Sequence, residues 1–319
     1  MPLKIHFLAP DPATFPSGGN HYNQALADAL TRKGCAVQFD TDWPGNADMV
    51  LVDSLMYPKW KEQLPSAPPV FLLAHLLPGM LPDQSTIRLS PKGWTGAITT
   101  GTPTKKYLLE SGWYEDQILV LEPGAETVLS VPQRRSSPLR IAWVANLLPD
   151  KGILPFLELL ETYQADFKAA TVQLSLAGSK SMDIDYAAAC LEKITRLTGV
   201  LEYLGPCSSA QISGLLKRSN LFISCSRFET FGMALQEARL HALPILALDG
   251  GVGNHLSIAT ESVDQLAKLI ERVLDLAQNR EQMQRLLDLA WLDRETYSGQ
   301  VFTWEQQATQ LLAFLSGRR

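Results

Sequence analysis

Short apolar runs alternate with segments of helical periodicity along almost the whole chain. In residues 20–33 the apolar side chains recur at the spacing of one helix face, at Tyr22, Ala25, Leu26, Ala29 and Leu30. The same spacing predicts further helices at residues 152–163, 185–197, 208–218, 230–242, 262–277, 279–296 and 303–316. The apolar runs predict strands at residues 4–9, 49–53, 70–74, 96–100, 118–121, 139–145, 172–177, 200–204, 221–225 and 245–248.

Strands that alternate with helices of this length are typical of parallel sheets covered by helices on both faces. The 319 residues suit two domains of about 150 residues each. Residues 127–138 hold two prolines and two arginines without any periodicity, so we expect an interdomain linker there. We therefore predict an α/β fold with two Rossmann-like, doubly wound domains, residues 1–130 and 131–302, and a ligand cleft at the carboxyl ends of their strands.

The composition excludes several classes of protein and several kinds of partner. Hydrophobic residues make up 46% of the chain and charged residues 19%, which excludes a disordered, collagen-like or coiled-coil protein. The net charge of −5 argues against a nucleic-acid partner. No apolar run approaches the roughly 18 residues of a transmembrane helix, and the first apolar run is too short for a signal peptide. The cysteines form no C-x-x-C pair, so we expect a cytoplasmic protein with reduced thiols.

Several motifs with known chemistry are missing from the sequence. There is no G-x-x-x-x-G-K-[ST], no G-x-G-x-x-G after the first strand, no H-E-x-x-H and no G-x-S-x-G. A kinase, a dinucleotide oxidoreductase and a serine hydrolase therefore lose support.

A predicted strand instead runs directly into the segment SRFETFGMALQE, which contains two glutamates. Glu229 follows the strand, and Glu237 lies about two turns into the next helix. Backbone amides around Phe231, Gly232 and Met233 have no intrahelical acceptor, so they can bind a phosphate. Carboxylates accept hydrogen bonds from vicinal hydroxyls, such as those of a ribose or a sugar ring. On these residues alone, a helix cap at Glu229 and a solvated Glu237 remain an equal alternative.

The segment 200–254 resembles the nucleotide-binding half of the retaining family 4 glycosyltransferases, which have the GT-B fold. The E-x7-E pattern of that family is matched by Glu229 and Glu237. The resemblance extends over nearly the whole chain through LEYLGPCSSAQISGLLKRSNLFIS, Gly250-Gly251, VANLLPDKG at 144–152, Ser17-Gly18-Gly19 and VLEPGAE at 120–126. E-x7-E is a weak signal by itself, but it is specific in this order of strands, glycine turns and helices.

The resemblance implies roles for the carboxyl-terminal residues. Glu237 would bind the ribose hydroxyls of the donor, and Glu229 would contact hydroxyls of the transferred sugar. The amides of Phe231, Gly232 and Met233 would lie near the sugar and phosphates.

It also implies roles for residues elsewhere in the chain. Lys151 would neutralise the diphosphate, and Gly18 and Gly19 would approach it from the other domain, because only glycine lets a backbone come so close. His75 would lie near the reacting sugar, although a histidine at a strand end can equally be structural.

The sequence departs from the family at two positions. Asn146 stands where relatives have an arginine, and Asn254 stands where they have a glutamate after the Gly-Gly turn. We therefore expect the nucleotide site to be kept and the positive charge at the diphosphate to be reduced.

Other candidate chemistry is weaker. Glu237 and His241 are four residues apart, but no third ligand has a suitable spacing, so we predict no metal site. Whether His255 faces the ligand is left open. Four tryptophans of the amino-terminal half are candidates for stacking on an acceptor sugar or for the core, namely Trp43, Trp60, Trp94 and Trp113.

The resemblance implies transfer of a sugar from a nucleotide diphosphate sugar (UDP, GDP or ADP) to an acceptor hydroxyl of a sugar or glycoconjugate. Configuration would be retained, no metal or other cofactor would be needed, and helix 303–319 would pack back onto the first domain. Two alternatives stay open. One is a nucleotide-sugar-binding protein with weakened catalysis, favoured by Asn146 and Asn254. The other is a GT-B nucleotide-sugar epimerase, for which no acid/base pair can be located.

Overall fold

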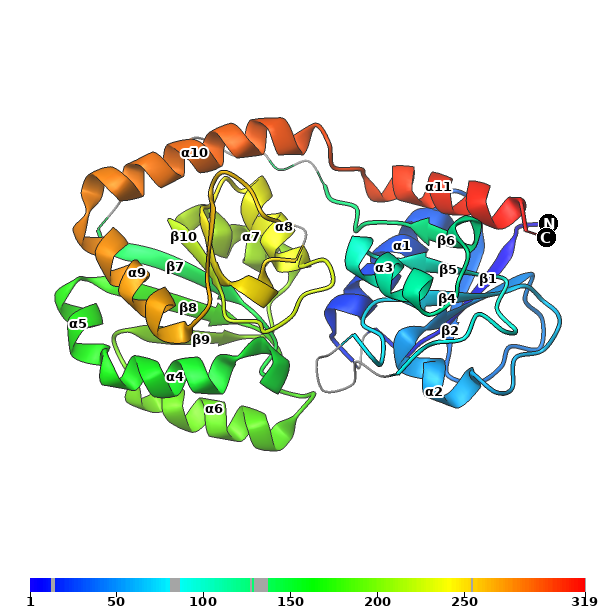
Figure 1. Ribbon diagram of the computed structural model, residues 1–319, viewed down its shortest axis with the longest axis horizontal. Helices are drawn as coiled ribbons and strands as arrows, with labels where there is room; N and C mark the ends of the chain where they lie inside the picture. Colours follow the sequence, from blue (N-terminus) through cyan, green and yellow to red (C-terminus); the bar gives the residue numbers. More distant parts are fainter. Residues whose placement is uncertain (13–14, 81–86, 127, 129–136, 254, 319) are drawn as a thin grey trace. The chain divides into compact units, whose positions relative to one another are not determined.

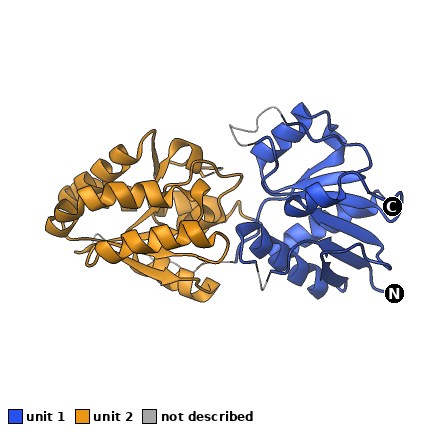
Figure 2. Cartoon of the chain, turned by 90° about the horizontal axis from the view of Figure 1, so that it is seen from below, with its two compact units in different colours: residues 1–126, 302–319 blue, residues 127–301 orange. Residues whose placement is uncertain are grey.

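The computed structural model describes residues 1–318 except 13–14, 81–86, 127, 129–136 and 254. The chain forms two compact units, coloured separately in Figure 2. Unit 1 comprises Met1–Glu126 and Phe302–Arg319, and unit 2 comprises Thr127–Val301. Most of the expected linker, residues 127–138, lies outside the described residues, as does Asn254.

Unit 1 contains one parallel six-stranded sheet in the order β2-β1-β3-β4-β5-β6. Its strands are β1 (Lys4–Leu8), β2 (Ala36–Asp40), β3 (Met49–Asp53), β4 (Val70–Ala74), β5 (Gly96–Thr99) and β6 (Ile118–Val120). Its helices are α1 (Gly18–Arg32), α2 (Tyr57–Trp60), α3 (Thr102–Glu110) and α11 (Trp304–Ser316). Every residue of β3 and β4 is buried, as expected for central parallel strands.

Helices cover both faces of this sheet (Figure 1). Phe71 of β4 packs against Phe314 of α11, with ring centroids 5.9 Å apart. Its neighbour Leu72 belongs to a cluster that includes Tyr107 and Leu108 of α3. Because successive side chains of a strand point to opposite faces, α11 and α3 cover opposite sides.

The last helix of the chain, α11, is part of unit 1. It packs against α1, where Glu305 forms an ion pair with Arg32 at 2.6 Å. The side-chain amide of Gln307 donates a hydrogen bond to the carbonyl of Glu122 at 2.7 Å. The chain therefore passes through unit 2 and ends on the unit in which it began.

Unit 2 contains a second parallel sheet, in the order β12-β11-β10-β7-β8-β9. Its strands are β7 (Leu139–Val144), β8 (Val172–Ala177), β9 (Leu201–Gly205), β10 (Leu221–Ser224), β11 (Ile245–Leu248) and β12 (Thr260–Val263). Its helices are α4 (Ile153–Thr162), α5 (Gln164–Ala169), α6 (Ile184–Arg196), α7 (Ser209–Arg218), α8 (Met233–Leu240), α9 (Leu266–Gln278) and α10 (Arg280–Ser298).

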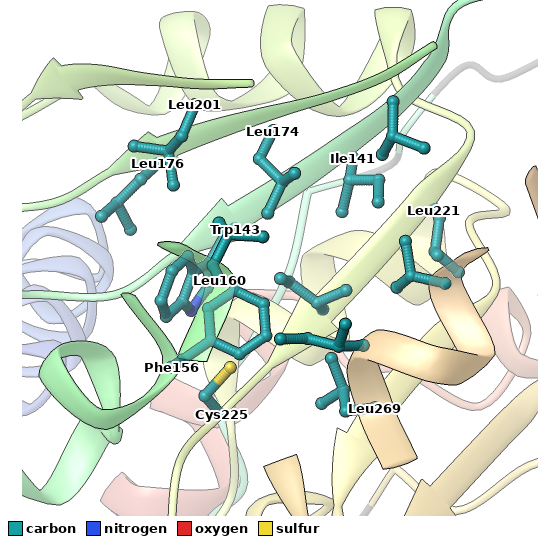
Figure 3. Close-up of a cluster of buried hydrophobic side chains, with 14 of the residues drawn as sticks. Ile141, Trp143, Phe156, Leu160, Leu174, Leu176, Leu201, Leu221, Cys225 and Leu269 are labelled. Carbon is teal, nitrogen blue, oxygen red and sulfur yellow. The ribbon is translucent and has the colours of Figure 1, made fainter. Parts of the chain in front are cut away.

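The core of unit 2 also lies on both faces of its sheet. Trp143 of β7 packs edge-on against Phe156 of α4 at 5.1 Å, inside the large cluster of Figure 3. The adjacent Ala142 belongs to the cluster that contains Leu215 of α7 and Leu235 of α8. Unit 2 is therefore doubly wound, as the sequence predicts.

The strand orders locate the two places where a ligand site is expected. In unit 2 the chain reverses its direction of winding between β7 and β10, and in unit 1 between β1 and β3. Ligands of open α/β sheets bind beyond the carboxyl ends of the strands at such a switch point. The relevant loops are those after β7 and β10 in unit 2, and those after β1 and β3 in unit 1.

Two predicted helices begin later than expected. The helix expected from residue 262 begins at Leu266, because residues 260–263 form the edge strand β12. The helix expected from residue 230 begins at Met233, because Gly232 has φ +90° and cannot be part of a right-handed helix. Among the helices of the described residues, none has the length and apolar character needed to cross a bilayer.

Candidate active site

The loop after β10 lies between two other loops of unit 2. The backbone amide of Arg227 donates to the carbonyl of Asp150 at 3.0 Å, in the turn after β7. The amide of Glu229 donates to the carbonyl of Gly250 at 3.1 Å, in the turn after β11. These two bonds fix the loop on both sides, and they position Glu229 at the switch point of the sheet.

Two glycines allow this close packing of three backbones. A Cβ atom at Gly152 would lie 2.2 Å from the carbonyl oxygen of Cys225, and Gly152 has φ +64°. A Cβ atom at Gly250 would lie 2.0 Å from the carbonyl oxygen of Arg227. Any side chain at either position would push the loops apart.

Lys151 and Glu229 form an ion pair at this point. Lys151 Nζ lies 2.8 Å from Glu229 Oε1 and 3.4 Å from Asp150 Oδ2. Burial lowers the pKa of Lys151, but the carboxylates of Glu229 and Asp150 outweigh burial and raise it above its ordinary value. A protonated lysine, which can donate hydrogen bonds to a phosphate, and a carboxylate, which can accept them from a hydroxyl, are therefore held side by side.

Glu237 lies in α8 and is partly buried. Burial raises the pKa of its carboxyl group to about 7. Within the described residues no group donates a hydrogen bond to this carboxyl group. A ligand with two hydroxyls could supply these hydrogen-bond donors. A buried carboxyl group that titrates near neutral pH is a common feature of functional sites.

The amides proposed to bind the phosphates do not all belong to the helix. Only Met233 lies in the first turn of α8, whereas Gly232 is the residue before it. Phe231 precedes both, and its buried ring packs edge-on against the ring of His255 at 4.8 Å. No side chain caps α8, so its first amides are not used by a capping residue.

Asn146 joins the loop after β7 to the loop after β8. Its Oδ1 accepts a hydrogen bond from the backbone amide of Ser179 at 2.8 Å, and its Nδ2 lies 3.4 Å from Met182 Sδ. The position at which the resemblance implies an arginine is therefore used here for a neutral bond between two loops of this chain.

In unit 1, the loop after β1 lies next to the end of β4. Ser17 caps α1 by accepting a hydrogen bond from the amide of Asn20 at 3.0 Å, so Gly18 and Gly19 form the first turn. A Cβ atom at Gly19 would lie 3.0 Å from the ring of His75. The sequence therefore identified Gly19 and His75 separately, and the fold brings them into contact.

Asp53 also belongs to this cluster, and sequence reasoning missed it. It ends β3 at the switch point, is fully buried, and lies 3.4 Å from His75 Nε2. The available signal was a single charged residue at the end of the apolar run MVLVD. Among the described residues, no group of three His, Cys, Asp or Glu side chains is arranged to hold a metal ion.

The model of the family "Glycosyl transferases group 1" matches residues 129–286. No curated protein is similar enough in sequence to count as a relative.

Solved structures share the fold at low identity. HepE (Alr3699) from Anabaena, in complex with UDP-glucose, is 15% identical with a TM-score of 0.73, over 99% of this chain and 100% of HepE. Sucrose-phosphate synthase from Thermosynechococcus elongatus is 15% identical with a TM-score of 0.71, over 99% of this chain and 98% of the synthase. TarM from S. aureus is 14% identical with a TM-score of 0.62, over 83% of this chain and 55% of TarM. This chain thus spans about half the length of TarM. Residues 129–286 therefore belong to the glycosyltransferases of group 1, and the chain as a whole has the GT-B fold of these solved structures.

Proposed function

We propose that this chain transfers a sugar from a nucleotide diphosphate sugar to an acceptor hydroxyl, with retention of configuration and without a metal ion. The observation that carries the proposal is the Lys151–Glu229 ion pair in the loops at the switch point of unit 2, with Glu237 in the helix α8 that follows the second loop. UDP-glucose is the first donor to test, because HepE of similar fold was solved with it. GDP and ADP sugars are the other donors, and the acceptor is a sugar or glycoconjugate.

Binding of the donor would separate the ion pair. The diphosphate competes with Glu229 for the ammonium group of Lys151, and charge-assisted hydrogen bonds of this kind are short and strong. Glu229 is then free to accept hydrogen bonds from hydroxyls of the transferred sugar. The amides of Phe231, Gly232 and Met233 add donors near the sugar and the phosphates.

Glu237 would bind the ribose of the nucleotide. In its ionised form the carboxylate accepts one hydrogen bond from each of two neighbouring hydroxyls. Since its pKa of about 7 is caused by burial, two donated hydrogen bonds would favour ionisation. Ribose binding and loss of a proton from Glu237 are thus coupled.

Unit 1 would contribute Gly18, Gly19 and His75 to the same reaction, the glycines near the diphosphate and the histidine near the sugar. In this scheme no side chain acts as nucleophile. The departing phosphate accepts the proton of the acceptor hydroxyl on the face from which it leaves, so configuration is retained. The rate would come from positioning and from positive charge beside the leaving group.

One observation favours a second function. Asn146 replaces the family arginine and bonds to Ser179, so the diphosphate would meet one cation fewer. A nucleotide-sugar-binding protein with weakened catalysis is therefore the alternative. Release of UDP from UDP-glucose, measured with and without a panel of acceptors, separates the two: a transferase shows acceptor-dependent turnover, and a binding protein shows only saturable binding.

A further inference from the structure

Asp53 is a fully buried carboxylate at the end of β3. Its Oδ1 accepts a hydrogen bond from the backbone amide of Leu55 at 2.7 Å, and its Oδ2 accepts one from Asn23 Nδ2 at 2.6 Å. Burial raises the pKa of Asp53, but His75 and these hydrogen bonds outweigh burial and lower it below its ordinary value. Burying a charge costs free energy, and only Oδ1 is used to cap the turn at Leu55, so Oδ2 is left to face Asn23 and His75.

The network determines which nitrogen of His75 carries hydrogen. His75 Nε2 lies 2.9 Å from Asn23 Oδ1 and 3.4 Å from Asp53 Oδ2. The amide group of Asn23 is oriented by its own donor, since Nδ2 bonds to Asp53 and lies 3.3 Å from Asn20 Oδ1. Both atoms that face Nε2 are therefore acceptors, so Nε2 must be the donor. Nδ1 has no hydrogen-bond partner within the described residues.

The ring is also held by its surroundings. The Tyr22 and His75 rings pack in a T-shaped arrangement with centroids 5.1 Å apart, and Gly19 also packs against the His75 ring. The carbonyl of His75 accepts a hydrogen bond from Thr104 Oγ1 at 3.2 Å. The side chain is only 14% exposed, so the ring has little freedom to turn.

We propose that Asp53 and Asn23 are positioning residues that hold His75 with hydrogen on Nε2 and leave Nδ1 to accept a hydrogen bond from a hydroxyl of the bound sugar. The identity of the ligand as a sugar rests on the proposed function. The orientation and tautomer of the His75 ring do not depend on the proposed function.

Asp53→Asn should reverse the tautomer. The amide of Leu55 requires an oxygen at the Oδ1 position, so the new amide nitrogen would stand at the Oδ2 position. It would then face Asn23 as a donor, and the Asn23 amide group would turn to present its oxygen. His75 Nε2 would now meet donors and become the acceptor, which moves the hydrogen to Nδ1. A wrong tautomer with otherwise intact geometry disables a histidine in other enzymes.

The experiment records long-range ¹H–¹⁵N spectra of the ¹⁵N-labelled full chain at about pH 8.5, about two units above the ordinary value for histidine. The signals of His75 are assigned by their loss in His75→Asn. We expect hydrogen on Nε2 in the wild type and on Nδ1 in Asp53→Asn. Hydrogen on Nδ1, or on both nitrogens, in the wild type would overturn the proposal even if no variant folds, as would an unchanged tautomer in Asp53→Asn.

Asp40→Asn is the matched control. Asp40 ends strand β2 of the same sheet, and its Oδ2 pairs with His6 Nδ1 at 3.0 Å, so the change removes a second Asp–His pair of the same unit. It should leave both the His75 tautomer and the turnover unchanged.

Turnover of UDP-glucose tests the role of Nδ1 separately. Asp53→Asn should lower kcat by on the order of tenfold or more and leave the affinity for UDP unchanged. Unchanged turnover, or an equal loss of UDP affinity, would contradict the positioning role. Failure of the proposed function looks different, because wild type and every variant would then lack turnover while the spectra would still report the tautomer.

Discussion

Lys151 and Glu229 form a 2.8 Å ion pair although they are 78 positions apart in the sequence. They belong to loops that follow β7 and β10, and these two strands are neighbours in the sheet only because the winding reverses between them. The fold thus brings a cation and a carboxylate to one point, where each neutralises the charge of the other.

Glu229→Gln should therefore tighten the binding of free UDP while it lowers turnover of the nucleotide sugar. The variant releases Lys151 from a charged partner, and a charge-assisted bond exceeds a neutral one by about 1 kcal/mol. We expect a several-fold gain in UDP affinity by calorimetric titration. Weaker binding of UDP would show that Glu229 itself supports the nucleotide.

Glu161→Gln is the control for this experiment. Glu161 pairs with Lys193 at 2.9 Å in the same unit, and the side chains of that pair are exposed to a similar degree as those of Lys151 and Glu229. It should leave UDP affinity unchanged, because the pair joins α4 and α6 away from the switch point.

The affinity for UDP should rise with pH through about 7. The ionised carboxylate of Glu237 is the form that accepts two ribose hydrogen bonds, and burial places its pKa at about 7. Binding should weaken progressively below that pH and level off above it. Glu237→Gln should bind UDP more weakly at pH 8, by about 1.5–3 kcal/mol, and lose this pH dependence. A pH profile that is the same in both proteins would remove Glu237 from the ribose site.

Glu237→Gln should also stabilise the protein at neutral and alkaline pH. The folded pKa of Glu237 is raised from 4.5 to about 7, so ionisation opposes folding. The destabilisation is absent below pH 4.5, grows between pH 4.5 and 7, and is complete above 7. Its upper limit is about 3 kcal/mol. Urea unfolding at pH 4.5 and pH 8 should show a gain in the free energy of unfolding only at pH 8, and no gain at pH 8 would contradict the raised pKa. Glu271→Gln, at an exposed position of α9, should show none at either pH.

Gly152→Ala should lower both stability and UDP affinity. Its Cβ would collide with the carbonyl of Cys225, and its positive φ is unfavourable for alanine, so Lys151 beside it would be displaced. Gly214→Ala is the matched control, because Gly214 lies inside α7 and its Cβ would meet nothing closer than 3.8 Å. It should raise the free energy of unfolding by about 0.5–1 kcal/mol and leave binding unchanged. Equal effects of the two substitutions would disprove the packing argument.

The sequence predicted the fold class correctly, and the strands it missed have a common cause. β2 and β12 are both edge strands, and most of their residues are only partly buried. Their sequences AVQFD and TESV therefore lack the continuous apolar run by which β3 and β4 were recognised. The exposure of an edge strand is a property of the whole sheet, which a local pattern does not contain.

The candidate site shows the same contrast between features that a local sequence pattern contains and features that depend on the whole fold. A conspicuous loop motif led to Glu229 and Glu237, and a resemblance led to Lys151. The direct pairing of Lys151 with Glu229 depends on strand order, which the sequence does not state. Asp53 was overlooked because a single charged residue after a strand has many ordinary explanations. Its proposed role rests on its burial and on the distance to His75, which are properties of the folded chain.

Acceptor-dependent release of UDP from UDP-glucose is the measurement that tests the central claim most directly. It should be recorded with EDTA present, for the wild type and for Lys151→Met, with the anomeric configuration of the product read by NMR. We predict turnover in the presence of EDTA, an α-linked product, and a loss of on the order of a hundredfold in Lys151→Met. The account would be contradicted by a β-linked product, by turnover that EDTA abolishes, or by a wild type that binds UDP, GDP and ADP sugars and transfers none of them to any acceptor.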